Sequence, residues 1–188
     1  MNPKIRLLLT VDSFIIAAFG LIGPIYAIYV EKIGGDILDA GLAFAIYSIS
    51  LGGISYFIGK LGDRIKNEYA MIFSGVLIST AGFFSYLLVQ NSFQLMIVQA
   101  ILGVGQAMYN PMYDVIFSTN IDNKKKDSEW ADWESLNFLI TGVSAIIGAW
   151  IADLFGFKIL FVIMGLCSLT SLLLIPQLKQ KSERGKKS

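Results

Sequence analysis

The sequence predicts an all-α protein that crosses a membrane six times. Hydrophobic residues make up 55% of the 188 positions and charged residues only 15%, whereas a soluble domain has about a quarter of its residues charged. The apolar residues form runs that approach ~20 residues, about the length of helix that crosses ~30 Å of hydrocarbon. These features exclude an ordinary soluble enzyme, and the length of the chain leaves room for about six or seven spans.

Six apolar runs give the predicted helices, and each run ends at turn-forming or charged residues. In chain order the predicted spans are about 7–29, 40–59, 69–90, 93–118, 133–152 and 157–176. The connecting segments hold Gly34-Gly35-Asp36, Asp63-Arg64, Asn91-Ser92, the charged run 122–134 and residues 153–156. The spans form one transmembrane domain, 1–178, followed by a basic cytoplasmic tail, 179–188. Residues 124–134 are expected to be a solvated loop that leads into a helix at the membrane surface.

The positions of lysine and arginine predict how the helices are oriented, because cytoplasmic loops of membrane proteins carry an excess of both. With the N-terminus in the cytoplasm, 13 of the 15 basic residues lie inside, and only Lys32 and Lys158 lie outside. The sequence therefore predicts a multi-pass protein of the cell membrane with both termini in the cytoplasm. Trp133 and Trp150, ~26 Å apart along one helix, are expected to mark the two interfaces.

Several kinds of site are excluded by the residue types that the chain lacks. There is no histidine, and the one cysteine, Cys167, lies in an apolar run. Metal sites built on imidazole or thiolate, and an internal disulfide, are therefore not expected. No constellation typical of an enzyme is recognised, so neither catalysis nor a cofactor is predicted. The net charge of +1 does not indicate nucleic-acid binding, because the charges lie in membrane loops.

A weak internal repeat is visible in the sequence. A shift of 87 positions lays Gly23-Pro24-Ile25-Tyr26 over Asn110-Pro111-Met112-Tyr113, and it also pairs Asp12 with Gln99. A shift of 90 pairs Asp63 with Asp153 at the ends of the second and fifth spans. Because three helices reverse the direction of the chain, spans 1–3 and 4–6 are predicted to be two inverted three-helix repeats.

The segment after the second span resembles the signature loop of the major facilitator superfamily, a Gly-x-Leu-x-Asp-Arg run between helices 2 and 3 on the cytoplasmic side. Here it reads Gly59-Lys60-Leu61-Gly62-Asp63-Arg64. The resemblance continues in the fourth span, with Gly103-x-Gly105 followed by Pro111, and at the entry to the sixth, with Gly156-Phe157-Lys158 and Phe161. It implies one half of the family's fold, and specifically the N-terminal half.

The chain departs from the family pattern at several positions. The loop continues Ile65-Lys66-Asn67-Glu68 in place of a glycine and two basic residues. Gln99 stands where the family usually has an arginine, and Gly148 is followed by alanine rather than by proline. The largest departure is length, since family members normally have twelve helices and this chain has six.

The loop between the second and third spans is the predicted cytoplasmic gate. Glycines permit a tight turn, and Asp63 at a helix end can accept hydrogen bonds from free backbone N–H groups. Arg64 can pair with a carboxylate of a neighbouring helix, which the resemblance implies would close the cytoplasmic side. The alternative is that Arg64 only follows the positive-inside rule. The predicted gating residues are Gly59, Gly62, Asp63, Arg64 and Asp114.

Polar side chains within the spans predict a solute cavity, because polar groups in a membrane are costly and usually face an interior. The fourth span carries four at helical spacing, and the fifth carries two followed by Ser144. Asp12, the deepest acid of the first span, is the best candidate for a titrating group, and a role at the helix start or in an ion pair is the alternative. The alternative is hydrogen bonding between helices with no contact to solute. The predicted cavity residues are Asp12, Tyr26, Tyr47, Gln99, Gln106, Asn110, Asn137 and Thr141.

These observations favour a secondary transporter that moves a small solute by alternating access, as a parallel homodimer of six-helix halves in the lipid bilayer. Identical copies related by an axis normal to the membrane would replace the two halves of a full family member. The chain is alternatively one half of a larger or heterodimeric transporter, or a membrane scaffold or regulatory subunit that does not transport. A membrane enzyme is the least favoured interpretation.

Overall fold

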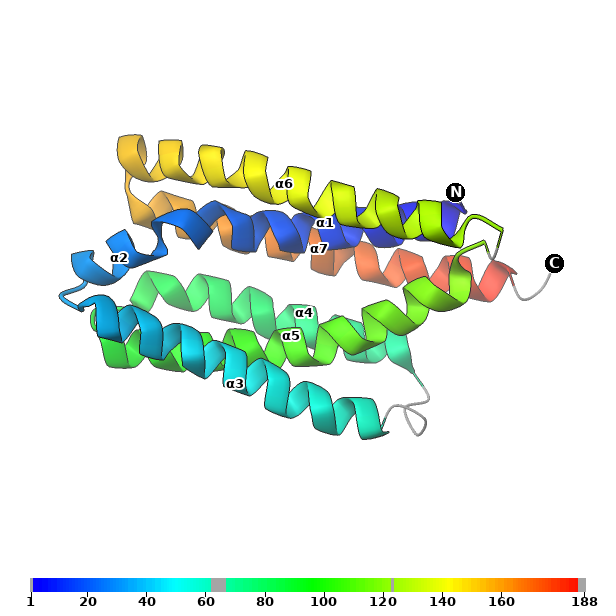
Figure 1. Cartoon of the computed structure of the whole chain (residues 1–188), viewed down its shortest axis with the longest axis horizontal. Helices are drawn as coiled ribbons and strands as arrows, with labels where there is room; N and C mark the ends of the chain where they lie inside the picture. Colours follow the sequence, from blue (N-terminus) through cyan, green and yellow to red (C-terminus); the bar gives the residue numbers. More distant parts are fainter. Residues whose placement is uncertain (1, 62–66, 123, 186–188) are drawn as a thin grey trace.

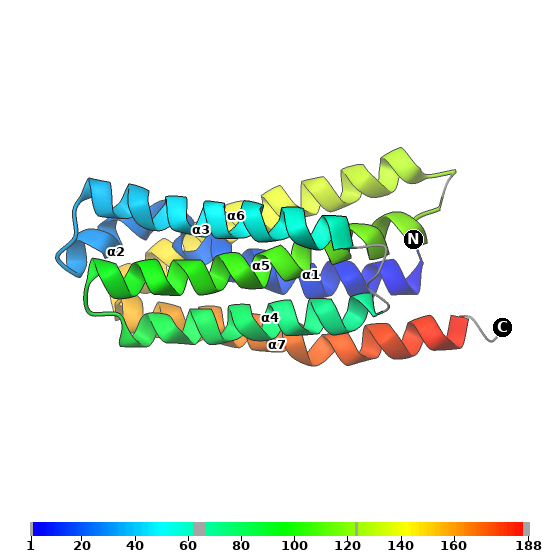
Figure 2. The same cartoon turned by 90° about the horizontal axis from the view of Figure 1, so that it is seen from below.

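The computed structural model describes residues 2–61, 67–122 and 124–185. Within these ranges six helices are long and apolar enough to cross a membrane, which confirms the predicted all-α polytopic fold class. They lie side by side as a bundle, with the start of the first span and the end of the last at the same end (Figures 1 and 2). The helices are α1 (Pro3–Ile22), α2 (Tyr26–Lys32), α3 (Ile37–Leu61), α4 (Glu68–Ser85), α5 (Ser92–Asn120), α6 (Lys126–Phe155) and α7 (Phe157–Gly185).

Two short 3₁₀ turns complete the spans. Gly23–Ile25 joins α1 to α2, so that the first span, Pro3–Lys32, is interrupted in its last third. Pro24 explains this break, because proline has no backbone N–H to continue the α-helical hydrogen bonds. Tyr86–Leu88 extends α4. In contrast, α5 remains one helix through Pro111.

The helices begin and end at residues suited to those positions. The side chains of Asn2, Asn67 and Asn91 accept hydrogen bonds from the backbone N–H groups of the first turns of α1, α4 and α5, which satisfies donors that a helix start leaves free. Gly34 and Gly156 have φ values of 83° and 81°, a region that favours glycine. These caps account for the short connections of the bundle.

The fifth span begins earlier than the sequence predicts. Residues 126–132 were expected in a solvated loop, but they form the first two turns of α6. Asp127 and Glu129 lie in the first turn, where acidic side chains favour a helix start. Glu129 is buried and accepts a hydrogen bond of 3.1 Å from the backbone N–H of Asp122. This contact joins the end of α5 to the start of α6.

The helices form two groups of three. One group contains α1, α6 and α7, and the other contains α3, α4 and α5, while the contact of α4 with α7 joins them. The two groups are the upper and lower layers of Figure 1. The closest pairings are unchanged when α1 is exchanged with α5, α3 with α6, and α4 with α7. Inverted repeats would give such a pattern, and the repeat itself stays a prediction.

Glycines allow close approach within each group. A Cβ atom at Gly148 of α6 would overlap the backbone of Leu21 in α1, and one at Gly103 of α5 would lie 2.6 Å from the carbonyl oxygen of Tyr47 in α3. Small residues at such positions let membrane helices pack through their backbones. Glycine packing therefore fixes the α1–α6 and α3–α5 contacts, which border the cavities described below.

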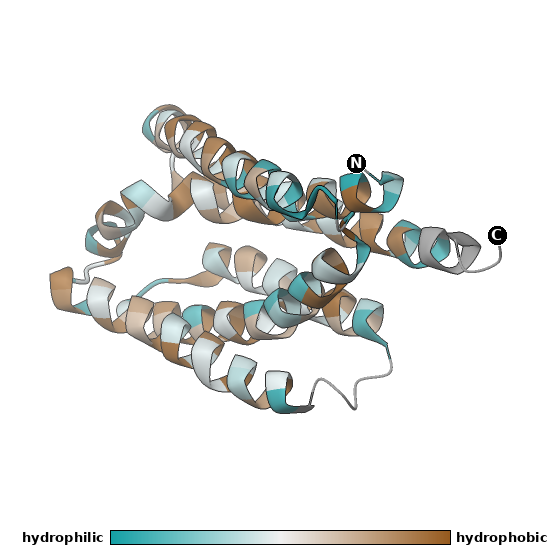
Figure 3. Ribbon diagram, turned by 45° about the vertical axis from the view of Figure 1, so that its right-hand side comes forward, coloured by the Kyte–Doolittle hydropathy of each residue, from teal (hydrophilic) through white to brown (hydrophobic). Residues whose placement is uncertain are grey.

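Two spans are much less covered by the rest of the bundle. Only 11% of the most apolar stretch of α3 and 17% of that of α6 are buried, compared with 44–56% in the other four spans. Large apolar side chains such as Phe44, Ile49, Phe138 and Ile146 are exposed on them. Hydrophilic residues gather near the helix ends, above all at the end that carries the N-terminus (Figure 3). The exposed apolar faces are those that lipid or another polypeptide would cover.

Candidate functional site

Two neighbouring cavities are lined in part by residues at the break in the first span. The polar cavity has a volume of about 480 Å³, and the aromatic pocket has one of about 160 Å³. Phe19 and Gly23 line both cavities. The lining of the polar cavity comes from α1, the 3₁₀ turn, α5 and α6, and comprises Asp12, Ile15, Ile16, Phe19, Gly20, Gly23, Pro24, Gln106, Tyr109, Asn110, Tyr113, Asp114, Trp133, Asn137 and Thr141.

Asp12 is the centre of a hydrogen-bond network in the polar cavity. Its side chain is only 6% exposed. The hydroxyl of Tyr109 donates to Oδ1 at 2.9 Å, and the indole N–H of Trp133 donates to Oδ2 at 2.8 Å. A buried carboxylate needs such donors, because removal from water disfavours it. The network connects α1, α5 and α6 at one point.

Tyr113 lies one turn further along α5 than Tyr109, and its hydroxyl is the buried side-chain polar atom without a hydrogen-bond partner among the described residues. The residue is only 2% exposed and lines the polar cavity. Leaving a buried hydroxyl unpaired costs ~1–3 kcal/mol. The Tyr113 hydroxyl is therefore buried beside the Asp12 carboxyl group without a well-formed hydrogen bond in this structure.

Two carboxyl groups face the polar cavity. Asp12 and Asp114 both line it, whereas no lysine or arginine of the described part of the chain does. Asp114 forms no hydrogen bond or ion pair with another described residue. Asn110, Asn137 and Thr141 add uncharged donors and acceptors along the same wall. This arrangement suits a cationic molecule that also has hydrogen-bonding groups.

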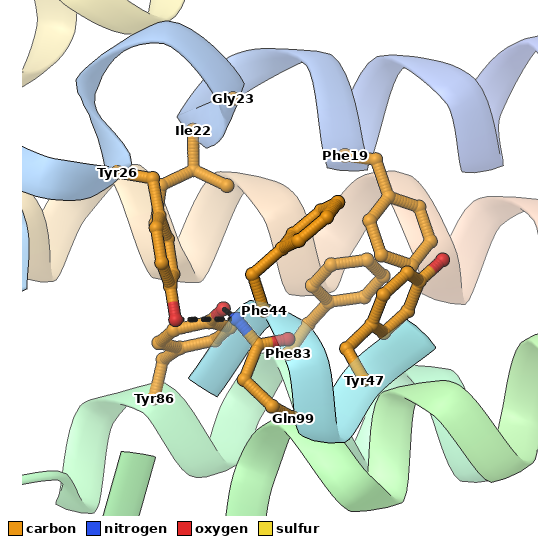
Figure 4. Close-up of a pocket in the computed structure, with 9 residues that line it drawn as sticks. All are labelled: Phe19, Ile22, Gly23, Tyr26, Phe44, Tyr47, Phe83, Tyr86 and Gln99. Carbon is orange, nitrogen blue, oxygen red and sulfur yellow. Dashed lines mark hydrogen bonds between the residues drawn. The ribbon is translucent and has the colours of Figure 1, made fainter. Parts of the chain in front are cut away.

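The aromatic pocket is built around Gln99 (Figure 4). The side-chain amide of Gln99 donates to the hydroxyls of Tyr26, at 2.7 Å, and Tyr86, at 3.2 Å. The ring of Phe19 packs against Phe83 at a centroid distance of 4.9 Å and against Tyr47 at 5.9 Å. The pocket is thus mostly aromatic, and its amide is hydrogen-bonded to two of its three tyrosine hydroxyls.

The predicted cavity residues do not share one cavity, because the Phe19 ring and the helix break separate them. Asp12, Gln106, Asn110, Asn137 and Thr141 line the polar cavity, whereas Tyr26, Tyr47 and Gln99 line the aromatic pocket. Gln106 also donates to the hydroxyl of Ser79 at 3.3 Å, which fits the alternative of hydrogen bonding between helices. Roles in solute binding stay predictions for all of these residues.

Two of the five predicted gating residues can be placed in the structure. Gly62, Asp63 and Arg64 lie outside the described residues, and Gly59 lies exposed near the end of α3, away from the two cavities. Asp114, the predicted partner of Arg64, lines the polar cavity. The gate therefore stays a prediction.

Sequence reasoning missed the aromatic members of the polar cavity. Trp133 was expected at the membrane interface, a position that stays a prediction, and its indole N–H donates inward to Asp12. It lies one turn before Asn137 on the same polar face of α6, a spacing that could have identified it. In contrast, Tyr109 and Tyr113 directly precede Asn110 and Asp114 in the sequence, and adjacent residues do not share a helix face. No polar pattern therefore distinguishes these two tyrosines from tyrosines of the core.

Comparisons with known proteins show the family to which the chain belongs. Residues 8–188 match the family model of the Major Facilitator Superfamily. The chain is 29% identical over 168 residues to a protein of Erwinia billingiae named multidrug resistance protein MdtG, a match that covers 86% of this chain and 40% of that protein. A protein of the same name from Serratia proteamaculans is 27% identical over 170 residues, with 88% and 41% covered.

A solved structure has a similar backbone. The crystal structure of the POT family transporter PepTSo matches with a TM-score of 0.77 and 13% identity, covering 96% of this chain and 38% of that one. The chain thus spans about 40% of the length of the curated relatives that it matches. The match of the family model over nearly the whole sequence decides the assignment, and the chain belongs to the Major Facilitator Superfamily, a family of membrane transporters.

Proposed function

We propose that the chain forms half of a transport unit that moves small organic cations across the cell membrane by alternating access. The observation that carries this proposal is the lining of the polar cavity, which combines Asp12, Asp114 and the unpaired hydroxyl of Tyr113 with no basic residue. Carboxylates and aromatic faces both attract cations. The relatives named as multidrug resistance proteins support a drug-like solute.

A second six-helix unit would complete the cavity in this proposal. The lining comes from α1, the 3₁₀ turn, α5 and α6. The poorly covered apolar faces of α3, which lines the aromatic pocket, and of α6, which lines the polar cavity, are available for contact with that unit. A second copy of the same chain is the proposed partner, arranged in parallel with both termini in the cytoplasm. The alternatives are a different six-helix half and a scaffold that does not transport.

The test is uptake of ethidium, a fluorescent organic cation, by liposomes that contain the purified chain. A transmembrane pH gradient supplies the driving force, and the initial rate is compared with that of liposomes containing Asp12→Asn. The matched control is Asp153→Asn, which changes an exposed carboxylate of α6 outside the cavity. The proposal expects ethidium uptake that Asp12→Asn abolishes and Asp153→Asn preserves.

Two results would contradict the proposal. Uptake that is unchanged in Asp12→Asn would exclude the polar cavity as the pathway. Absence of uptake would contradict transport by this chain alone, and native mass spectrometry then tests the proposed homodimer. A species of about 41 kDa, twice the chain's 20.7 kDa, supports a homodimer, whereas a species of 20.7 kDa alone contradicts it.

A further inference from the structure

A third cavity, of about 350 Å³, lies at the end of the bundle opposite the two termini. We call it the lysine pocket. It is formed by the end of α2, the turn after α4 and the connection between α6 and α7 (Figure 1). Lys32 and Lys158 lie at its edge, and its aromatic residues are Tyr29, Tyr86, Phe157 and Phe161. Neither lysine lines the polar cavity or the aromatic pocket.

The two lysines of this pocket are unusual in the chain. They are the two basic residues that the count of lysines and arginines assigns to the outer side, and the fold brings them to one cavity although they are far apart in the sequence. The Nζ atom of Lys32 lies 5.3 Å from the centre of the Phe157 ring. No carboxylate among the described residues forms an ion pair with either lysine. Both ammonium groups therefore belong to one pocket without an ion pair, although the exposed carboxylates of Glu31 and Asp153 lie on the same segments.

The start of α7 adds to the positive potential. Helix α7 begins at Phe157, directly after Gly156, and both residues line the pocket. The first N–H groups of a helix have no partner within it, and the helix dipole makes this end positive. The two ammonium groups and the first N–H groups of α7 are thus the groups that could bind an anion in the pocket, while the C-terminal ends of α2 and α6 beside them carry the opposite dipole.

The surroundings of the pocket are apolar. Tyr29, Tyr86 and Phe161 are almost fully buried and pack against one another, with ring centroids 4.8 Å apart for Tyr86 and Phe161. Below the pocket, α7 exposes Ile159, Val162 and Leu166, whose spacing places them on one face of the helix. A soluble anion would gain nothing from this face, whereas a molecule with hydrocarbon chains would cover it.

We propose that the lysine pocket binds the headgroup phosphate of an anionic phospholipid, with its acyl chains along the exposed face of α7. The pocket lies at one end of the membrane-spanning helices, the level at which phospholipid headgroups are found. Basic pockets between membrane helices are a known way to hold anionic headgroups. The bound lipid would join the end of α2 to the start of α7 and so steady the outer end of the first span.

The test is native mass spectrometry of the purified full chain in detergent. Phosphatidylglycerol is titrated and compared with phosphatidylcholine that has the same acyl chains, since the latter headgroup has no net charge. We expect the chain to retain phosphatidylglycerol preferentially. Lys32→Gln and Lys158→Gln are each expected to weaken its binding about fivefold, because one basic residue near an anionic headgroup is worth ~1 kcal/mol. Lys32→Arg and Lys158→Arg are expected to preserve it.

Lys60→Gln is the matched control, because the Nζ atom of Lys60 also lies over an aromatic ring, 4.4 Å from the centre of Tyr56, but lines none of the cavities described here. It is expected to leave lipid binding unchanged. Equal retention of both lipids, or equal binding by Lys32→Gln/Lys158→Gln and the unaltered chain, would overturn the proposal. Displacement of the lipid by millimolar glycerol 3-phosphate would also overturn it in favour of a soluble anion. Circular dichroism shows whether each variant is folded.

Discussion

The polar cavity and the aromatic pocket are built on the same plan but differ in charge. In the polar cavity Asp12 accepts hydrogen bonds from Tyr109 and Trp133, and in the aromatic pocket Gln99 donates to Tyr26 and Tyr86. Each is a buried polar residue held by two aromatic side chains from other segments. The predicted repeat pairs these two positions. One arrangement of aromatic side chains thus surrounds a carboxyl group in the polar cavity and a neutral amide in the aromatic pocket.

The difference in charge assigns different roles to the two cavities. A carboxylate in a poorly solvated site interacts strongly with a cation and can exchange a proton. An amide can do neither, and the hydroxyls around Gln99 are already satisfied. We therefore expect the polar cavity to determine which solute binds and the aromatic pocket to hold the outer ends of the helices together.

The largest effect is expected from Asp12→Asn. The substitution removes the carboxyl group, so one of the two donors keeps only a neutral amide oxygen and the other faces an NH₂ group, and hydrogen bonds to charged groups contribute ~1.5–3 kcal/mol. Ethidium binding, measured by fluorescence anisotropy of the purified chain, is expected to weaken about 10- to 100-fold. Asp153→Asn should bind like the unaltered chain. Equal loss in both variants would mean that surface charge, rather than the network of Asp12, attracts the cation.

Gly148→Ala tests the packing that borders the polar cavity. The added Cβ atom would overlap the backbone of Leu21 and push α6 away from α1, and overpacking of this kind costs ~1–3 kcal/mol. We expect a lower midpoint of heat unfolding in detergent. Gly142→Ala is the control on the same helix, because nothing lies within 4 Å of a Cβ atom there. An unchanged midpoint in Gly148→Ala would show that the α1–α6 contact is looser than described.

Gln99→Leu tests the hydrogen bonds at the centre of the aromatic pocket, where the central residue is uncharged. The hydroxyls of Tyr26 and Tyr86 lose their shared partner, and a neutral hydrogen bond contributes ~0.5–1.5 kcal/mol. The midpoint of heat unfolding should fall modestly, while ethidium binding should change less than twofold. A loss of binding as large as that of Asp12→Asn would refute the separation of the two cavities into solute-binding and structural roles.

The sequence predicted the number of spans and the family because both depend on local signals. Apolar length identifies a membrane helix wherever it packs, and Gly59–Arg64 is recognisable without neighbours. The division of the predicted cavity was not predictable, because Asp12 and Gln99 have the same pattern of one polar residue within an apolar run. What separates them is the position of Phe19 between the cavities, which depends on tertiary packing. The hydrogen bond from Trp133 to Asp12 was not predicted for a related reason, since an indole suits both a membrane interface and a buried hydrogen bond.

Tyr113→Phe should change the stability of the protein least. The substitution is expected to stabilise the protein without solute and to weaken its binding of a solute. The hydroxyl of Tyr113 is buried without a described partner, so its removal relieves a desolvation penalty of ~1–3 kcal/mol. The midpoint of heat unfolding without solute should therefore rise slightly.

If the hydroxyl of Tyr113 binds the solute, the affinity of Tyr113→Phe for a cation with hydrogen-bonding groups, such as ethidium, should fall by roughly threefold to tenfold. The affinity for tetraphenylphosphonium, which has no such groups, should not fall. A variant that is stabilised and binds both cations unchanged would show that the incomplete hydroxyl has no part in solute binding, and Asp12 would then remain the feature that distinguishes the polar cavity from the aromatic pocket.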